Sequence, residues 1–417
     1  MNIPSLRTLF ITTAGDPYPP TGGVHLRYLQ QFDIMSQFGS VAVFSMGDKE
    51  SKEQAIPGVD LRYHYNTTER KNSLRQKLEL RFPWLYPGKY PYRSKVGKYT
   101  KDGAKKFQKL LTEFKPDLVI AEMWTYRYFP LVKSYGCHFI LDQHNVHGVW
   151  LEEIYRAYSE IEQRKLTIRQ KIELVRTKPL ERRLVRQADQ VWICSDADQK
   201  QLQSLYGPLS HSQVIPNGIK IANYDCIHLG KYDFPEGLDK GGKNILYLGR
   251  FSYSVNAEAV ELLINEIYPR LRQVYPDCQL LLVGRNPNQR MVEAAQRDSG
   301  IIVTGAVSDI RPYLAVATVM AVPLRHGGGT RLKILEAFAA KCPVVSTAKG
   351  AEGLQANDGE HLLIRDEAEG MVEGVCQLLS DPSLGARLAN SAYELVKTEY
   401  SWQAVGKKIE SAIRELF

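Results

Sequence analysis

The residues best suited to chemistry lie in one short stretch, VPLRHGGGTRLKILEAF, at residues 322–338. Gly327, Gly328 and Gly329 let backbone N–H groups approach a ligand closely, because glycine has no Cβ. A helix predicted to begin at Thr330 adds unpaired N–H groups and the positive end of its dipole, and this combination binds phosphate. The stretch therefore predicts a phosphate site.

Three charged side chains follow the glycines. Arg331 and Lys333 fall in the first helical turn, where a cation opposes the helix dipole, so we expect an anion beside them. Glu336 comes one turn later and is placed to accept hydrogen bonds from ribose hydroxyls, as the acidic residue of dinucleotide-binding folds does. Taken alone, a glycine loop before a helix is common in α/β proteins, and Glu336 alone would suit a solvated helix. The combination favours a nucleotide phosphate site.

The elements that must position this stretch form a strand, loop, helix and strand. A buried strand ends near Leu324, the helix is predicted to end near Lys341, and the next strand begins at Pro343. Such an order is typical of a βαβ unit in a parallel sheet. Strand and helix patterns alternate along most of the chain, which predicts an α/β fold.

A similar unit opens the chain, where Gly22 and Gly23 follow a strand at residues 6–13. Ligands of open α/β sheets bind at the carboxyl ends of the strands, so these glycines are candidate binding residues, or else a turn without a ligand. A buried strand at residues 139–141 ends in the polar cluster DQHN. Its His144 is a second candidate at a strand end, although a single histidine is often structural.

Length and composition indicate an ordinary globular protein of two domains. The chain has 417 residues, of which 44% are hydrophobic and 24% charged. Residues 47–101 are predicted to be irregular, and residues 152–187 to form one long helix. Six scattered cysteines indicate neither a zinc site nor a disulfide framework, and we expect no metal ion and no cofactor. Because the first residues predict a strand and not a signal peptide, we expect a cytoplasmic protein.

The net charge of +8 is concentrated in residues 70–109, where aromatic residues lie between the basic ones. No nucleic-acid recognition motif accompanies these charges, so we expect no nucleic-acid partner. Basic residues near aromatic ones suit an anionic membrane surface, and an exposed helical face explains them equally well. The first alternative would place the protein peripherally on the inner face of the membrane.

Together these segments resemble glycosyltransferase family 4, whose members use nucleotide-sugar donors, and the resemblance covers nearly the whole chain. The matching segments are PYPPTGG at 17–23, DQHN at 142–145, ADQVWICSDAD at 188–198, VIPNG at 214–218, YLGR at 247–250, LLLVG at 280–284, GAVSDIRPYLA at 305–315 and the stretch at 322–338. Each segment is a modest signal, whereas their order and spacing are specific.

The resemblance implies the GT-B fold, in which two Rossmann-like domains face each other across a cleft. We expect an acceptor-binding domain at 1–222, a linker at 223–243, a nucleotide-sugar-binding domain at 244–397, and a last helix at 398–417 that packs toward the first domain. It also implies a retaining, metal-independent transfer of a hexose, with a uridine diphosphate sugar favoured. The acceptor would be a glycan or a lipid-linked oligosaccharide, in the branch that makes envelope or extracellular polysaccharide.

The resemblance also implies roles for individual residues. His144 would contact the transferred sugar, Arg250 would neutralise the departing diphosphate, and Glu336 would hold the ribose. The full set is His144, Arg250 and Lys333 for catalysis and Gly22, Gly23, Gly327, Gly328, Gly329, Thr330, Arg331 and Glu336 for donor binding.

Two departures from the family pattern concern the donor site. The family usually has a glutamate eight positions before the second one, and here that position is Gly328, which puts the identity of the sugar in doubt. Glu352 is a weak substitute. The family also usually has a lysine shortly after the arginine of YLGR, where this chain has SYSVN. Lys333, with Arg331, is our candidate for the missing positive charge.

Other classes of protein fit less well. A nucleotide-sugar epimerase would need placed acid and base carboxylates, and none is evident. A nicotinamide dehydrogenase would need a tight G-x-G-x-x-G after the first strand, where this chain has AGDPYPPTGG. A catalytically inactive partner or glycan-binding subunit with the same fold would tolerate loss of Arg250 and Glu336, and both residues are present.

Overall fold

The computed structural model describes residues 5–20, 22–47, 55–66, 99–161, 163, 165–234, 238, 241–329 and 331–417. The chain divides into two compact units, which are described separately below. The first unit comprises Met1–Leu151, Leu166–Pro216 and Gly406–Phe417, and the second comprises Glu152–Lys165 and Asn217–Val405. The chain thus passes from one unit to the other within helix α6 (His147–Ile161) and within helix α18 (Trp402–Leu416).

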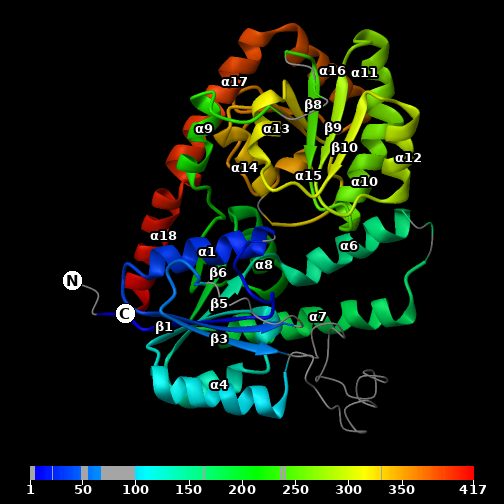
Figure 1. The fold of residues 1–417 in the computed structure, drawn as a ribbon. Coiled ribbons are helices and arrows are strands. Elements are labelled where there is room, and N and C mark those ends of the chain that lie inside the picture. Colours follow the sequence, from blue (N-terminus) through cyan, green and yellow to red (C-terminus); the bar gives the residue numbers. More distant parts are fainter. Residues whose placement is uncertain are drawn as a thin grey trace. The chain divides into compact units, whose positions relative to one another are not determined.

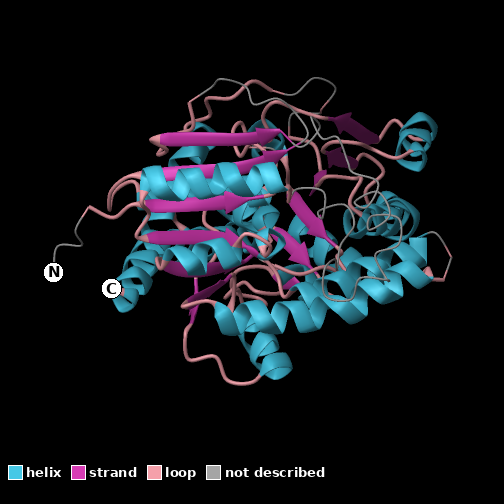
Figure 2. Ribbon diagram, turned by 90° about the horizontal axis from the view of Figure 1, so that it is seen from below, coloured by secondary structure: helices cyan, strands magenta, loops and turns pink. Residues whose placement is uncertain are grey.

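The first unit contains a seven-stranded sheet in the order β3-β2-β1-β4-β5-β6-β7, in which all neighbours are parallel. The strands run side by side in one direction (Figure 2). Their bounds are Thr8–Thr12 (β1), Val41–Gly47 (β2), Leu61–Asn66 (β3), Leu118–Glu122 (β4), His138–Gln143 (β5), Gln190–Ile193 (β6) and Ser212–Val214 (β7). Such fully parallel sheets are covered by helices on both faces.

Alternate side chains of β1 face the two helical layers of this unit. Leu9 and Ile11 belong to the cluster that also contains Phe107 of α4. Phe10 instead packs edge-on against Phe32 of α1, with ring centroids 4.8 Å apart. Helices α1 and α4 accordingly cover opposite faces of the sheet (Figure 1). The helices between and after the strands are α1 (Gly23–Met35), α4 (Lys101–Phe114), the 3₁₀ turn η2 (Met123–Thr125), α5 (Phe129–Tyr135), α7 (Ile168–Gln187) and α8 (Asp196–Tyr206).

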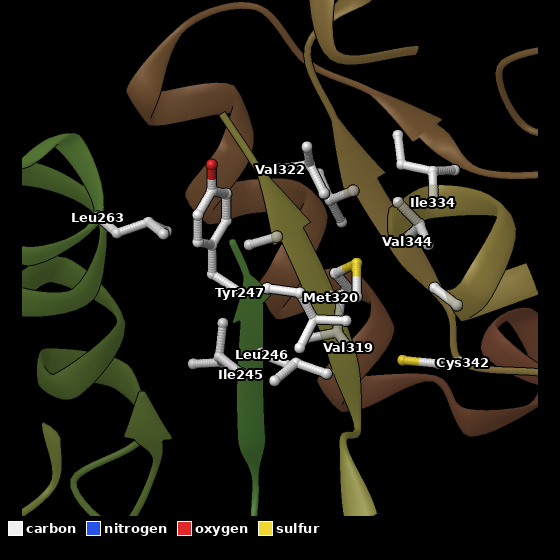
Figure 3. Packing of buried hydrophobic residues seen from close by; sticks show 14 of the residues in the cluster. Ile245, Leu246, Tyr247, Leu263, Val319, Met320, Val322, Ile334, Cys342 and Val344 are labelled. Carbon is white, nitrogen blue, oxygen red and sulfur yellow. The ribbon is translucent and has the colours of Figure 1, made fainter. Parts of the chain in front are cut away.

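The second unit contains a six-stranded parallel sheet in the order β10-β9-β8-β11-β12-β13. Its strands are Asn244–Leu248 (β8), Gln279–Val283 (β9), Ile301–Gly305 (β10), Val319–Val322 (β11), Val344–Ser346 (β12) and Leu363–Ile364 (β13). The residues of β8 and β11 are all buried, as their apolar sequences NILYL and VMAV require. Figure 3 shows their side chains packed with Leu263, Ile334 and Val344.

Short helices connect these strands and extend beyond them. They are η3 (Ile221–Tyr224), α9 (Asp225–His228), α10 (Ser254–Leu262), the π-helical turn η4 (Leu263–Ile267), α11 (Tyr268–Val274), α12 (Gln289–Arg297), α13 (Arg311–Val316), α14 (Leu332–Ala339), α15 (Ala348–Ala351), α16 (Ala368–Ser380), α17 (Pro382–Leu395) and the π-helical turn η5 (Val396–Tyr400). The α/β class predicted from the sequence is therefore confirmed in both units.

Two local predictions were wrong. The region predicted to be irregular contains β3, an edge strand that leaves Leu61 exposed and so lacks a continuous apolar run. The long helix predicted at 152–187 is two helices, α6 and α7. Thr167 caps α7, accepting a hydrogen bond from the N–H of Gln170 while the Gln170 side chain accepts one from Thr167 N–H.

Residues 70–98 of the basic region lie outside the described residues. Among the lysines of α4 that are described, Lys106 pairs with Asp102 and Lys109 with Glu113. No described helix is both long enough and apolar enough to cross a membrane.

Candidate functional site

The topology of the second unit brings two predicted segments to one place. From β8 the chain builds the sheet outward through β9 and β10, then returns to β11 on the other side of β8. In such sheets the crevice for a ligand lies at the carboxyl ends of the two strands where this reversal occurs. Arg250 follows β8, and the glycine loop at 327–329 follows β11. Both therefore lie at the edge of the sheet where the topology predicts a ligand site.

The glycine loop has a backbone that requires glycine at two of its three positions. Gly327 and Gly329 have φ values of 101° and 77°, in the left-handed region that other residues rarely adopt. The guanidinium of Arg331, which is 8% exposed, donates to the carbonyl oxygens of Gly327 at 2.6 Å and Gly328 at 2.9 Å. Since the N–H of the next residue points opposite to each carbonyl, the N–H groups of Gly328 and Gly329 point away from Arg331.

Arg331 thus braces the loop from one side, and a ligand on the other side would meet backbone N–H groups. Its guanidinium also lies 3.4 Å from the carbonyl oxygen of Lys349. Thr330, the fourth predicted member of the loop, lies outside the described residues. Helix α14 begins at Leu332, two residues later than predicted, and Lys333 and Glu336 lie in its first two turns.

Asn256 links Lys333 to the segment after β8. Its side-chain oxygen accepts hydrogen bonds from Lys333 Nζ at 2.9 Å and from the Tyr247 hydroxyl at 2.8 Å. Its amide nitrogen donates to the carbonyl oxygen of Arg250 at 3.0 Å. The Lys333 ammonium also lies 4.0 Å from the centre of the Tyr247 ring. Asn256 therefore holds Lys333 next to the backbone of Arg250.

The Arg250 side chain is exposed and only lightly restrained. Its Nε donates to the Ser252 hydroxyl at 3.0 Å, and its two terminal nitrogens have no hydrogen-bond partner among the described residues. A guanidinium with free donors matches the geometry of phosphate oxygens.

Burial moves the two titratable groups of α14 away from their charged forms. Burial raises the pKa of Glu336 to about 7, against the attraction of Lys333 and a hydrogen bond with Tyr224. Burial and the charge of Arg331 lower the pKa of Lys333 well below its ordinary value, against the attraction of Glu336. An anion bound at Lys333 and hydroxyl donors at Glu336 would each favour the charged form.

A cavity of about 580 Å³ opens beside the end of β10. It is lined by residues 306–308, by the start of α13 and by three aromatic residues, Tyr232, Phe234 and Tyr313. The Asp309 carboxylate pairs with Arg311 at 2.6 Å, and Arg311 also donates to the carbonyl oxygen of Asn223. Tyr224, which forms a hydrogen bond with Glu336, is the residue after Asn223. Arg311, which lines this cavity, therefore contacts the segment that holds Glu336.

His326, the residue before the glycine loop, is held by two carboxylates. Its Nε2 lies 3.1 Å from Glu160 and 3.6 Å from Glu258, and these three side chains are the group among the described residues that could hold a metal ion. Glu352, considered above as a substitute glutamate, pairs with Lys349 at 2.6 Å.

The predicted residues of the first unit lie at the carboxyl ends of its strands. His144 follows β5, and Gly22 and Gly23 follow the loop after β1 and begin α1. A Cβ on Gly22 would meet no atom within 4 Å, so packing does not explain glycine there. The structure thus places His144, Gly22 and Gly23 in one unit and Arg250, Lys333 and Glu336 in the other.

Sequence reasoning missed two residues that organise these sites, Asn256 and Arg27. Asn256 lies in the SYSVN segment, where a lysine was expected and absent. Arg27 lies in α1, and its guanidinium forms an ion pair with Asp142. A signal for Arg27 was its charge in the middle of an otherwise buried helix face.

The fold defines the class of protein. The structure is similar to sucrose-phosphate synthase from Thermosynechococcus elongatus, with a TM-score of 0.73, 19% identity and 99% of each chain covered. It is also similar to Anabaena HepE in complex with UDP and glucose, with a TM-score of 0.68, 15% identity and coverage of 98% and 99%. The chain therefore has the two-domain fold of GT-B glycosyltransferases.

Sequence comparison narrows this class. Residues 41–223 match the model described as Glycosyltransferase Family 4, and residues 242–381 match that of Glycosyl transferases group 1. Together with the fold, these matches support a glycosyltransferase of the family 4 type.

Characterised relatives align with part of this chain. A phosphatidyl-myo-inositol mannosyltransferase of Mycolicibacterium smegmatis is 30% identical over 202 residues, 47% of this chain and 50% of that protein. A glycogen synthase of Mycobacterium tuberculosis is 28% identical over 234 residues, 53% of each. The chain spans about half the length of these curated relatives.

Proposed function

We propose that this protein transfers a hexose from a uridine diphosphate sugar to a glycan or lipid-linked oligosaccharide, with retention of anomeric configuration. The observation that carries the proposal is that Arg250, the glycine loop and Lys333 lie together at the carboxyl ends of the neighbouring strands β8 and β11, with Asn256 joining Lys333 to the backbone of Arg250. Those groups suit a diphosphate, and the neighbour HepE, similar in fold, was solved with UDP and glucose.

The residues would divide the work of binding as follows. The N–H groups of Gly328 and Gly329 would hold phosphate oxygens, and Glu336 would accept hydrogen bonds from the ribose. The cavity beside β10 would receive the base, with the Asp309–Arg311 pair keeping its wall in place. Gly22, where packing does not explain the glycine, and its neighbour Gly23 would approach the donor or the acceptor.

Transfer breaks the bond between the anomeric carbon and a diphosphate oxygen and forms a bond to an acceptor hydroxyl. Negative charge develops on the leaving diphosphate. Arg250 and Lys333 would stabilise this charge, and one well-placed donor of this kind typically contributes about 3 kcal/mol. Asn256 keeps Lys333 beside Arg250, so the two cations would act on the same group.

We propose that Lys333 replaces the lysine that the family usually has after YLGR. Asn256 occupies that segment instead and carries no charge. Its side-chain oxygen receives the ammonium of Lys333 from α14. The positive charge would thus reach the site from another element.

A panel of UDP, GDP, ADP and dTDP sugars tests this function, with heat of binding and nucleotide release as the measurements. We expect saturable binding of one donor, weaker binding in Glu336→Gln, and about 100-fold slower release in Arg250→Gln. Arg270→Gln is the control. Arg270 is exposed on α11, the helix that precedes the amino end of β9, whereas the proposed site lies at the carboxyl ends of the strands. No binding of any donor by the folded protein would favour an inactive partner subunit.

The peripheral membrane location is a separate proposal. It rests on the basic composition of residues 70–109. Sedimentation with vesicles of anionic and of neutral lipid tests it: binding to anionic vesicles alone is expected, and no binding to them at low salt would refute the proposal.

A further inference from the structure

His144 lies in a buried network that extends across the first unit. The carboxylate of Asp142 is fully buried and receives the Arg27 guanidinium through Nε at 3.1 and 3.0 Å and through a terminal nitrogen at 2.5 Å. Gln31 donates to the same carboxylate at 3.0 Å. The Nε2 atom of His144 lies 3.1 Å from Asp142 Oδ2.

Asp142 is ionised in this network. Burial alone would raise the pKa of its carboxyl, but the charge of Arg27 and the hydrogen bonds from Arg27 and His144 outweigh burial and hold that pKa well below its usual value. An ionised carboxylate can only accept hydrogen bonds. The His144 nitrogen that contacts it must therefore carry the proton.

We propose that Asp142 and Arg27 are positioning residues that hold His144 as the Nε2–H tautomer and leave Nδ1 to face the substrate. The ligand at Nδ1 would be a hydroxyl of the transferred sugar, and this part of the inference rests on the proposed function. Neutral His144 then accepts a hydrogen bond from that hydroxyl at Nδ1. Among the described residues Nδ1 has no hydrogen-bond partner.

Arg27 has a second function in this arrangement. Its other terminal nitrogen donates to the carbonyl oxygen of Ile215 at 2.7 Å, so it ties the end of β5 to the segment after β7. The Tyr28 ring packs edge-on against His144, with centroids 5.5 Å apart. The imidazole is therefore restrained at its Nε2 edge and on its ring, and its side chain is 10% exposed.

The tautomer can be measured on the whole protein without any substrate. Nitrogen-15 spectra of histidine-labelled protein, with the signals of His144 identified by their loss in His144→Gln, report which ring nitrogen carries the proton. We expect protonated Nε2 and unprotonated Nδ1 at a pH where the ring is neutral. A protonated Nδ1 would overturn the inference.

Two substitutions test the consequence for the reaction. The amide of asparagine overlays Nδ1 of histidine, whereas that of glutamine overlays Nε2. His144→Asn should therefore retain at least about tenfold more kcat/KM than His144→Gln, and the opposite order would refute a role for Nδ1.

Replacing the pair tests positioning while avoiding an unpaired buried charge. In Arg27→Gln/Asp142→Asn the carboxylate is absent, and we expect His144 to show a mixture of tautomers. An unchanged Nε2–H tautomer in this variant, or in Asp142→Asn if only that one folds, would show that other contacts set the tautomer. If the tautomer is as expected but no donor is turned over, the proposed function fails and the positioning stands.

Discussion

Replacing Glu336 by glutamine should make the stability of the second unit less dependent on pH. Glutamine has the same shape, can still accept the Tyr224 hydrogen bond and never ionises. The pKa of Glu336 rises from 4.5 to about 7 in the folded protein because the carboxyl is buried. The native state then binds this proton more tightly than the unfolded chain, so its contribution to stability is complete below pH 4.5. It is lost as the pH rises through about 7.

The size of the effect follows from the two pKa values. Each pKa unit corresponds to about 1.36 kcal/mol. Compared with low pH, where the carboxyl is protonated in both states, Glu336 therefore lowers the unfolding free energy by about 3.3 kcal/mol at pH 8 and by about 0.8 kcal/mol at pH 5. Relative to Glu336→Gln, the wild-type protein should lose about 2.5 kcal/mol of unfolding free energy between pH 5 and pH 8.

Urea unfolding of both proteins at pH 5 and pH 8, followed by circular dichroism, measures this difference. Glu266→Gln, which removes an exposed carboxylate from the same unit, is the control. A difference between wild type and Glu336→Gln that is equal at the two pH values would refute the reasoning. It would mean that the folded protein stabilises the charged Glu336 carboxylate as well as water does in the unfolded chain.

The other predictions concern charge, backbone and packing. UDP binding at pH 7 should release a proton from Glu336, whose pKa is raised to about 7 by burial, so that the observed heat depends on the buffer. Glu336→Gln should lack this release, and identical proton exchange in both proteins would contradict the prediction. Gly284→Ala should destabilise the protein by about 3 kcal/mol or more, because the added Cβ would lie 1.7 Å from the Gly249 carbonyl oxygen. Gly359→Ala is the comparison: Gly359 also has a positive φ, but its Cβ would meet no atom within 4 Å, so we expect a loss of only about 1 kcal/mol in the same urea assay. Asp142→Asn should cost about 3–5 kcal/mol because the buried Arg27 guanidinium loses the carboxylate that neutralises its charge. The double variant with Arg27→Gln should cost less than the sum of the single changes, and additive losses would argue against the pair. Arg331→Met should raise the KM for the donor, since the loop carbonyls lose their donors, and an unchanged KM would mean that the loop keeps its shape without them.

The sequence by itself determined the class of fold and the places where ligands could bind. Continuous apolar runs such as NILYL predict strands buried on both faces, and glycines after such strands mark the carboxyl edge of a parallel sheet. These signals are local, because a run of four to six residues is enough to show burial. The edge strand β3 was missed for the same reason, since half-exposed strands carry no continuous run.

What the side chains do was decided only by the tertiary structure. Arg331 appeared to be a phosphate ligand from its place in the chain, yet its guanidinium is occupied by the loop's own carbonyls. Asp142 and Arg27 are 115 residues apart, and Lys333 and Asn256 are 77 apart. Whether a charge is paired, and so whether it is available to a ligand, depends on which groups burial brings within about 3 Å. That proximity is a property of the packed fold, which the spacing of residues along the chain does not contain.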